Sequence, residues 1–299
     1  MSYIFDKSNT HEWKEHLDEN GYVVLKDILQ QQEKDAIFQT FLQEMKIVSP
    51  KLDFDNPETL VNKNTPIIFS KGIACFNGFG QSNFMWKLRL NNNIQNIFKH
   101  IHNTDELVTS LDGFSLFVSS KQKSNPWLHI DQNPSNNIYS IQGSYNFKPV
   151  NESSSGFILI PKSHSKKIDQ QVKHSNDWII MNEQKELMKQ SIKLIIPENC
   201  FVLWNSKLIH SNTGMKKGNY FDRLTCYITY LPKSLRSETV YKKRQNSYLN
   251  SNTTSHWANK CEVKRYPNHF KLNYEKKNFH NLKSLLINDT IPNDRLKLL

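Results

Sequence analysis

The segment CFVLWNSKLIH, residues 200–210, contains two short apolar runs separated by the polar residues Asn205 and Ser206. Short runs that are rich in β-branched and aromatic residues and bounded by turn-forming residues are typical of buried strands. The second run ends at His210, and the imidazole of histidine is a common metal ligand. The segment therefore predicts two strands with a candidate ligand at the end of the second.

The same texture continues on both sides of this segment, from about residue 112 to residue 231. Short runs of strand-forming residues alternate there with turn residues, at the spacing expected of a barrel or jelly roll. The expected strands are Phe114–Ser119, Trp127–Asp131, Ile138–Phe147, Gly156–Ile160, Ile192–Ile196, Cys200–Trp204 and Leu224–Leu231. Residues 162–189 form a longer polar insert with room for a helix. The pattern predicts a mainly β fold.

Helical patterns flank this region. Residues 10–19, 30–46 and two segments after Ser82 have the apolar spacing of helices, and GYVVL at residues 21–25 predicts one early strand. Thr10 and Ser82 are the expected helix caps. We expect a helical N-terminal flank with one early strand over residues 1–110 and a β core over 111–235. A basic C-terminal extension or cap is expected over 236–299, all within one compact domain.

The chain has 299 residues and a formal net charge of +11, and most of the excess positive charge lies in its last quarter. Residues 236–299 contain 13 Lys and Arg against 5 Asp and Glu, whereas residues 1–235 contain 26 against 23. Only 6 of the basic residues are Arg, although phosphate and base recognition favours arginine. A nucleic acid or other polyanion is therefore a secondary hypothesis for the C-terminal region. A cap packed over the barrel, which could shape substrate access, is favoured over an RNA-binding tail that uses His256 and Trp257.

The cysteines and the N-terminal residues bear on the cellular compartment. Cys75, Cys200, Cys226 and Cys261 are widely spaced and form no C-x-x-C pair, so we expect reduced, mostly buried thiols. Acidic residues stand near the N-terminus where a secretory signal needs an apolar segment, and no apolar run is long enough to span a membrane. These features predict an intracellular, cytoplasmic protein without a membrane span.

The strongest chemical signal is WLHID at residues 127–131. His129 and Asp131 are two apart on a predicted strand, so their side chains project from the same face. In chains of this composition roughly every second one contains an H-x-D triplet by chance, so the pair alone carries little weight. His210 adds a third ligand, because a jelly roll can bring two such strands together. Two histidines and one carboxylate form the facial triad of non-haem Fe(II) oxygenases, which makes these three the candidate catalytic and metal-binding residues.

Candidate co-substrate residues follow from the neighbouring strands. Arg223 lies 13 residues after His210, with Thr225 on the same face of its strand. A buried arginine needs an anion, and the distal carboxylate of 2-oxoglutarate matches the guanidinium fork. The alternative is an ordinary salt bridge with Asp222 or Glu198.

The strand at residues 138–147 also has a polar face, which we expect to line the pocket. Its members are Ser140, Gln142, Ser144 and Asn146. Gln142 is the candidate for a further co-substrate or substrate contact, and the alternative is a structural amide. Trp127 is in step with the two candidate ligands and is expected to form a wall of the site.

Five segments, taken in order, resemble the phytanoyl-CoA dioxygenase family of Fe(II)- and 2-oxoglutarate-dependent oxygenases. They are GYVVLKDIL (21–29), WLHID (127–131), YSIQGSYNF (139–147), GFILIPKSHSKK (156–167) and LWNSKLIHSNTG (203–214), the last leading to Arg223. The resemblance implies a double-stranded β-helix core of the jelly-roll, cupin-like kind. It further implies that His129, Asp131 and His210 bind Fe(II) and that Arg223 binds 2-oxoglutarate.

Two features depart from the family pattern. Members commonly have a small hydroxyl residue two positions after the distal histidine, where it helps to hold 2-oxoglutarate, whereas this chain has Asn212. The amide can also donate a hydrogen bond, so Asn212 is a candidate co-substrate contact. The segment between His210 and Arg223 is also slightly long. His164, in the PKSH signature, is expected to be structural.

The resemblance implies a dioxygenase that uses O2 and 2-oxoglutarate to hydroxylate a C–H bond of a small or acyl-type substrate, with release of succinate and CO2. Fold alone does not fix the substrate. Two alternatives remain: a nucleic-acid or protein hydroxylase with the same triad, and a catalytically silent β-barrel that binds polyanions.

Overall fold

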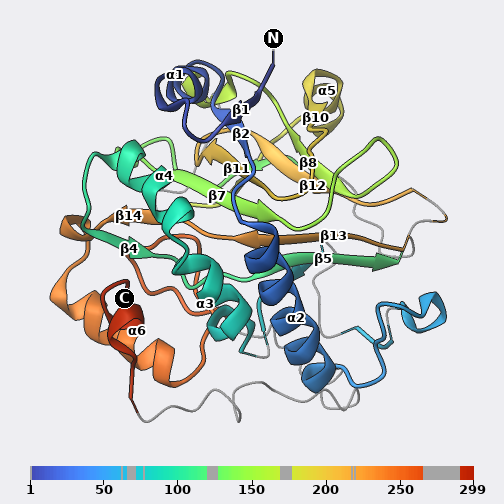
Figure 1. Ribbon diagram of the computed structural model, residues 1–299. Helices are drawn as coiled ribbons and strands as arrows, with labels where there is room; N and C mark the ends of the chain where they lie inside the picture. The colour runs from blue at the N-terminus through green and yellow to red at the C-terminus, as the bar shows by residue number, and fades with distance from the viewer. Residues whose placement is uncertain are drawn as a thin grey trace.

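A computed structural model describes residues 2–61, 63–65, 72–76, 78–119, 127–168, 177–216, 218, 220–264 and 290–299. The elements follow the order β1, α1, β2, α2, β3, α3, α4, β4 to β9, α5, β10 to β14, α6 and α8, with four short 3-10 helices between them. Most strands belong to two sheets that face each other, and helices cover the outer face of the larger sheet (Figure 1).

The larger sheet has seven strands in the order β1-β2-β11-β7-β13-β5-β3. These are Ile4–Asp6, Tyr22–Lys26, Cys200–Asn205, Ile141–Asn146, Tyr220–Tyr227, Phe114–Ser119 and Ile73–Ala74. All of its pairs are antiparallel except β1 with β2. Strand β2, from the N-terminal flank, pairs directly with β11 and so belongs to the same sheet as the core strands.

The smaller sheet has five strands in the order β10-β8-β12-β6-β9, and all of its pairs are antiparallel. These are Ile192–Lys193, Gly156–Leu159, His210–Thr213, His129–Ile130 and Ile179–Ile180. A separate pair joins β14 (Tyr230–Pro232) to β4 (Leu107–Thr109). The two main sheets form the double-stranded β-helix core that the sequence predicts.

Alternation along the strands gives each sheet two different faces. In β11, Phe201 and Leu203 pack against the helices, whereas Val202 and Trp204 pack between the two sheets. The core between helices and sheet also contains apolar side chains of β5, β7 and β13. The corresponding inward face of β7 and β13 is polar, so the space between the sheets can accommodate a site.

The helices of the N-terminal flank form the outer layer. They are α1 (Thr10–Asn20), α2 (Gln31–Val48), α3 (Asn83–Arg89) and α4 (Asn92–His102), and α2, α3 and α4 lie over the large sheet (Figure 1). Further along the chain are α5 (Gln184–Gln190), α6 (Glu238–Leu249) and α8 (Asn293–Leu296). The C-terminal end lies beside α6.

The two expected helix caps, Thr10 and Ser82, do not make the predicted capping hydrogen bonds. Thr10 is the first helical residue of α1, after Asn9, and makes no capping hydrogen bond. Ser82 stands at the cap position of α3, but its hydroxyl donates to the Phe79 carbonyl instead. The buried carboxylate of Glu44, from α2, accepts the first two N–H groups of α3, at 2.7 and 3.1 Å. The sequence pattern could not reveal this cap, because Glu44 is distant in sequence.

The strands, the cysteines and the absence of a membrane-spanning helix are also predicted from the sequence. The seven expected strands from Phe114 to Leu231 each overlap an observed strand, and α5 and β9 lie largely within the polar insert. The second strand expected in residues 200–210 is wrong, because the observed strand β12 begins at His210 instead of ending there. Cys75, Cys200 and Cys226 are buried thiols and Cys261 is half-buried, all unpaired within the described residues. No helix in the described ranges has the length and apolar character needed to cross a bilayer. The basic stretch at residues 265–289 lies outside the described residues.

Gly143, at the centre of β7, offers a direct test of how the sheet packs. A Cβ atom there would lie 2.3 Å from Phe201 Cε1 and 2.9 Å from the Ile228 carbonyl oxygen. Because overpacking of a close-packed core is destabilising, we expect Gly143→Ala to lower the free energy of unfolding by about 1–3 kcal/mol. Urea denaturation measures the change. Ser144→Ala adds no atom in the same strand and is the control; equal stabilities for the two variants would contradict the packing.

Candidate active site

His129 and His210 lie side by side because the strands that carry them pair in register. In the antiparallel pair β6–β12, His129 and His210 are direct partners, and their ring centroids are 4.3 Å apart. Both side chains project from the inner face of the small sheet, whereas Ile130 and Ile209 pack on its outer face. Both histidines are almost completely buried.

Main-chain carbonyls fix the orientation of both imidazoles. His129 Nδ1 lies 2.9 Å from the carbonyl of Trp127, and His210 Nδ1 lies 2.8 Å from that of Leu208. A carbonyl only accepts, so each Nδ1 must carry the proton and donate it. Each Nε2 is therefore the ring nitrogen that faces away from the main chain, and this orientation is typical of metal-binding histidines.

Both Nε2 atoms converge on the carboxylate of Asp131. His129 Nε2 is 3.5 Å from Oδ1 and His210 Nε2 is 3.2 Å from Oδ2. Asp131 follows β6 directly, and its main-chain N–H donates to the Ser206 carbonyl, which fixes the turn. The three ligand atoms lie within 4.8 Å of one another, the one such group found in the described part of the chain.

The protonation states also suit a metal ion. Burial lowers the pKa of His129 to about 3, with a further contribution from His210, so the imidazole is neutral at physiological pH. Burial alone would raise the pKa of Asp131, but the adjacent His129 and His210 outweigh it and hold that pKa well below its usual range. Neutral imidazoles and an ionised carboxylate are the forms that bind metals. Two nitrogen ligands and one oxygen ligand fit a divalent transition metal with open coordination positions.

Gln142 and Trp127 support this group from either side. Gln142, on the inner face of β7, donates its amide hydrogen to Asp131 Oδ2 at 3.0 Å. Trp127 stacks face to face on His129, with ring centroids 3.9 Å apart and an angle of 4° between the ring planes. Trp127 therefore forms a wall of the site. Of the four polar residues expected to line the pocket from β7, only Gln142 does so.

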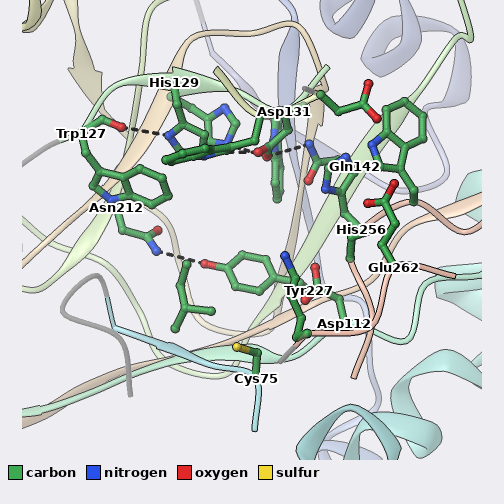
Figure 2. A pocket seen from close by; sticks show the side chains of 18 of the residues that line it. Cys75, Asp112, Trp127, His129, Asp131, Gln142, Asn212, Tyr227, His256 and Glu262 are labelled. Atoms are coloured by element: carbon green, nitrogen blue, oxygen red, sulfur yellow. Dashed lines mark hydrogen bonds and ion pairs between the residues drawn. The ribbon is translucent and has the colours of Figure 1, made fainter. Parts of the chain in front are cut away.

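The group opens into a cavity of about 810 Å³ between the two sheets. Figure 2 shows Trp127 and Asn212 on one side of it, Asp112, His256 and Glu262 on the other, and Tyr227 and Cys75 opposite His129. The cavity volume is in the range of pockets that hold small organic molecules. Apolar lining comes from Ile73, Phe157, Trp178, Ile180, Trp204 and Trp257.

Arg223 and Thr225 are not among the residues that line this cavity. Arg223 is buried, donates to Thr225 Oγ1 at 3.1 Å and to the Gly156 carbonyl at 2.5 Å, and forms no ion pair with a described residue. Thr225 in turn donates to Asn146. The salt bridges weighed as alternatives are absent in the described ranges, because Asp222 accepts from Ser155 and Glu198 pairs with Lys34.

Asn212 forms a polar cluster with Ser115 and Tyr227. The sequence predicts a role for Asn212 but not for the other two residues. Its amide donates to Ser115 Oγ and to the Tyr227 hydroxyl, each at 3.1 Å, and those two oxygens are 2.6 Å apart. Tyr227 lies on the same strand face as Arg223 and Thr225, so the two-residue period could have revealed it. Asn212 and Tyr227 line the cavity (Figure 2), whereas Arg223 does not.

Residues of the C-terminal region also line the cavity. His256, Trp257, Glu262 and Lys264 all contribute side chains. They come from a segment with no recognisable motif, and no sequence pattern links it to the triad. His164 lies apart from the cavity, where its Nε2 contacts the Asp18 carbonyl at 3.1 Å.

No protein-family model matches the sequence. Ava biosynthesis cluster protein O of Aspergillus versicolor is 20% identical over 259 residues, which span 80% of this chain and 83% of that protein.

Several solved structures share the fold. The epimerase SnoN, in complex with Fe3+, alpha ketoglutarate and nogalamycin RO, has a TM-score of 0.54 at 13% identity, covering 76% of this chain and 85% of SnoN. EctD from S. alaskensis, with 2-oxoglutarate and 5-hydroxyectoine, has a TM-score of 0.53 at 16% identity, covering 76% and 77%. HygX from Streptomyces hygroscopicus, with nickel and 2-oxoglutarate, has a TM-score of 0.50 at 14% identity, covering 74% and 87%. This chain therefore has the double-stranded β-helix fold of these enzymes.

The contact between Gln142 and Asp131 can be tested by metal binding. Removing a hydrogen bond to a metal-ligating side chain typically weakens metal affinity about 10- to 100-fold. We therefore expect Gln142→Ala, which removes the hydrogen bond to Asp131, to weaken metal binding by this factor. Titration with Co(II), followed by its visible absorption, measures the affinity. Gln190→Ala, at the exposed end of α5, is the matched control. An unchanged affinity in Gln142→Ala would show that Asp131 does not depend on this amide.

Proposed function

We propose that this protein is an Fe(II)- and 2-oxoglutarate-dependent oxygenase that oxidises a C–H bond of a small organic molecule. His129, Asp131 and His210 would hold the iron through their Nε2 and carboxylate atoms. Bound iron would supply activation of O2, coupled to conversion of 2-oxoglutarate to succinate and CO2. This chemistry requires coordination positions that the protein leaves open, and a triad on one face meets that requirement.

The observation that carries the proposal is the convergence of His129 Nε2, His210 Nε2 and the Asp131 carboxylate, which lie within 4.8 Å of one another. Both Nδ1 atoms contact main-chain carbonyls, so both Nε2 atoms face the Asp131 carboxylate. Structural neighbours support the choice of group, since SnoN was crystallised with Fe3+ and HygX with nickel, each together with the keto acid.

Arg223, Thr225 and Asn212 are proposed to bind the co-substrate. The Arg223 guanidinium has no carboxylate partner among the described residues, and burial lowers its pKa, which marks a charge without a counter-ion. The distal carboxylate of 2-oxoglutarate would supply that counter-ion. Because this guanidinium does not line the cavity, neighbouring side chains would have to move for the carboxylate to reach it.

We propose hydroxylation as the outcome, and the protein's contribution to it is orientation and exclusion of water. Aromatic walls around the triad, including Trp127, Phe157 and Trp204, limit solvent at the reacting carbon. The sequence resemblance to the phytanoyl-CoA dioxygenase family belongs to this proposal too. SnoN is described as an epimerase, so the same fold also supports a different outcome. The volume of the cavity, about 810 Å³, favours a small-molecule substrate over a nucleic acid or protein.

Anaerobic titration with Fe(II) and 2-oxoglutarate tests the reaction class. Chelation of the keto acid by triad-bound iron should produce a visible charge-transfer band, and His210→Ala should abolish it because one of three ligands is lost. His164→Ala, a histidine away from the cavity, should retain the band. Wild-type protein that shows no band at saturating 2-oxoglutarate would overturn the proposal.

Arg223→Lys tests the co-substrate contact separately. Lysine keeps the positive charge but loses the planar fork, so we expect 2-oxoglutarate to bind roughly 10- to 100-fold more weakly while Fe(II) affinity is retained. Titration of the same charge-transfer band with 2-oxoglutarate gives the affinity. An unchanged 2-oxoglutarate affinity would assign Arg223 a purely structural role.

A further inference from the structure

One wall of the cavity is built by the segment Thr253–Lys264, which folds back on itself. Thr254 and Val263 form an antiparallel bridge, and main-chain hydrogen bonds join Ser255 to Glu262 and Lys264 to Thr253. The segment is fixed to the body of the protein, because Thr254 N–H donates to the Leu111 carbonyl and Gly80 N–H donates to Thr253 Oγ1. Trp257 is buried at its centre. The side chains that it directs into the cavity are therefore held in place.

His256 has an unpartnered ring nitrogen on this wall. Its Nε2 is buried and has no hydrogen-bond partner, although its side chain lines the cavity. Burial lowers the pKa of His256, which favours the neutral ring. A buried polar atom without a partner costs free energy, which a bound ligand can recover.

Two carboxylates lie beside His256. Asp112 accepts a hydrogen bond from the adjacent Gly113 N–H and forms no ion pair with a described residue. Burial raises the pKa of Asp112, only partly offset by Lys264, as expected for a carboxylate that lacks a close counter-ion. Glu262 is 3.7 Å from Lys260, but that lysine makes a closer ion pair with Asp177. Figure 2 shows Asp112, His256 and Glu262 on the same side of the cavity.

Counting charges on this wall leaves an excess of negative charge. Lys260 neutralises Asp177, so Asp112 and Glu262 remain against a single ammonium group, that of Lys264. This excess stands out in a chain whose formal net charge is +11. Aromatic rings of Trp127, Trp178 and Tyr227 line the other parts of the same cavity.

We propose that the substrate is an amine, that the carboxylates of Asp112 and Glu262 attract its protonated nitrogen to the wall beside His256, and that the aromatic walls hold its apolar body. The inference rests on the proposed function, whose substrate class it names. An ammonium group is a hydrogen-bond donor with a positive charge, so either carboxylate can accept from it. Charge-assisted hydrogen bonds to carboxylates are the strong ones, and aromatic faces add attraction for a cation. An alcohol would gain less from this wall, and an acid would be repelled by it.

Three probes of similar shape test the charge preference: 2-phenylethylamine, 2-phenylethanol and phenylacetate. Isothermal titration calorimetry measures their binding to protein loaded anaerobically with Fe(II) and 2-oxoglutarate, and again to metal-free protein. We expect the amine to bind at least about 10-fold more tightly than the alcohol, and phenylacetate to bind most weakly. The metal-free series reports on the wall even if the loaded complex does not form.

Two variants tie the preference to this wall. Asp112→Asn keeps the acceptor for Gly113 but removes the charge, so it should weaken amine binding about 10-fold and leave alcohol binding unchanged. Glu262→Gln should act in the same direction. Glu186→Gln, an exposed acid on α5 that pairs with Lys189, is the matched control and should change nothing.

The outcomes separate this inference from the proposed function. A charge-transfer band together with equal binding of amine and alcohol, or with no amine binding, would overturn the amine inference and leave the oxygenase proposal intact. An amine preference that persists unchanged in Asp112→Asn would also overturn it. A missing band together with an amine preference lost in Asp112→Asn would overturn the oxygenase proposal and retain the amine site.

Discussion

The two-residue period of the central strands is the constraint on which the rest of the molecule depends. It gives the seven-stranded sheet an apolar face, where Phe201 and Leu224 pack under the helices, and an inner face that is polar along β7 and β13. Burial of the apolar face stabilises the sheet, so the polar face is free to carry chemistry. Gln142, Thr225 and Tyr227 all point into the space between the sheets for this one reason.

Strand register then decides whether a site exists. His129 and His210 are direct partners in β6–β12, and a slip of one residue would turn one histidine toward the outer apolar layer formed by Ile130 and Ile209. The same alternation that buries those isoleucines therefore places both imidazoles inside. Asp131 completes the group from just beyond the end of β6, where its N–H is held by Ser206.

Much of this arrangement could be predicted from the sequence, because strands and their faces are local properties. The spacing of His129 and Asp131 and the apolar runs before His210 were sufficient to propose the triad, and the structure brings these three together. The cap on α3 by Glu44 and the location of Arg223 outside the cavity lining could not be predicted. They depend on contacts between residues distant in sequence, which no periodicity encodes. The contribution of His256 to the cavity wall could not be predicted for the same reason.

The wall formed by Thr253–Lys264 has an evolutionary consequence. The candidate metal ligands lie in or directly after strands of the small sheet, whereas this wall comes from a separate segment. That segment is attached through the Thr254 N–H to the Leu111 carbonyl and through Thr253 Oγ1 to the Gly80 N–H. Neither attachment involves the side chains of His256, Glu262 or Lys264, which line the cavity. Substitutions in the segment can therefore change which molecule is accepted without disturbing the reacting centre. A lineage of such proteins can diversify its substrates by drift in one short stretch of chain.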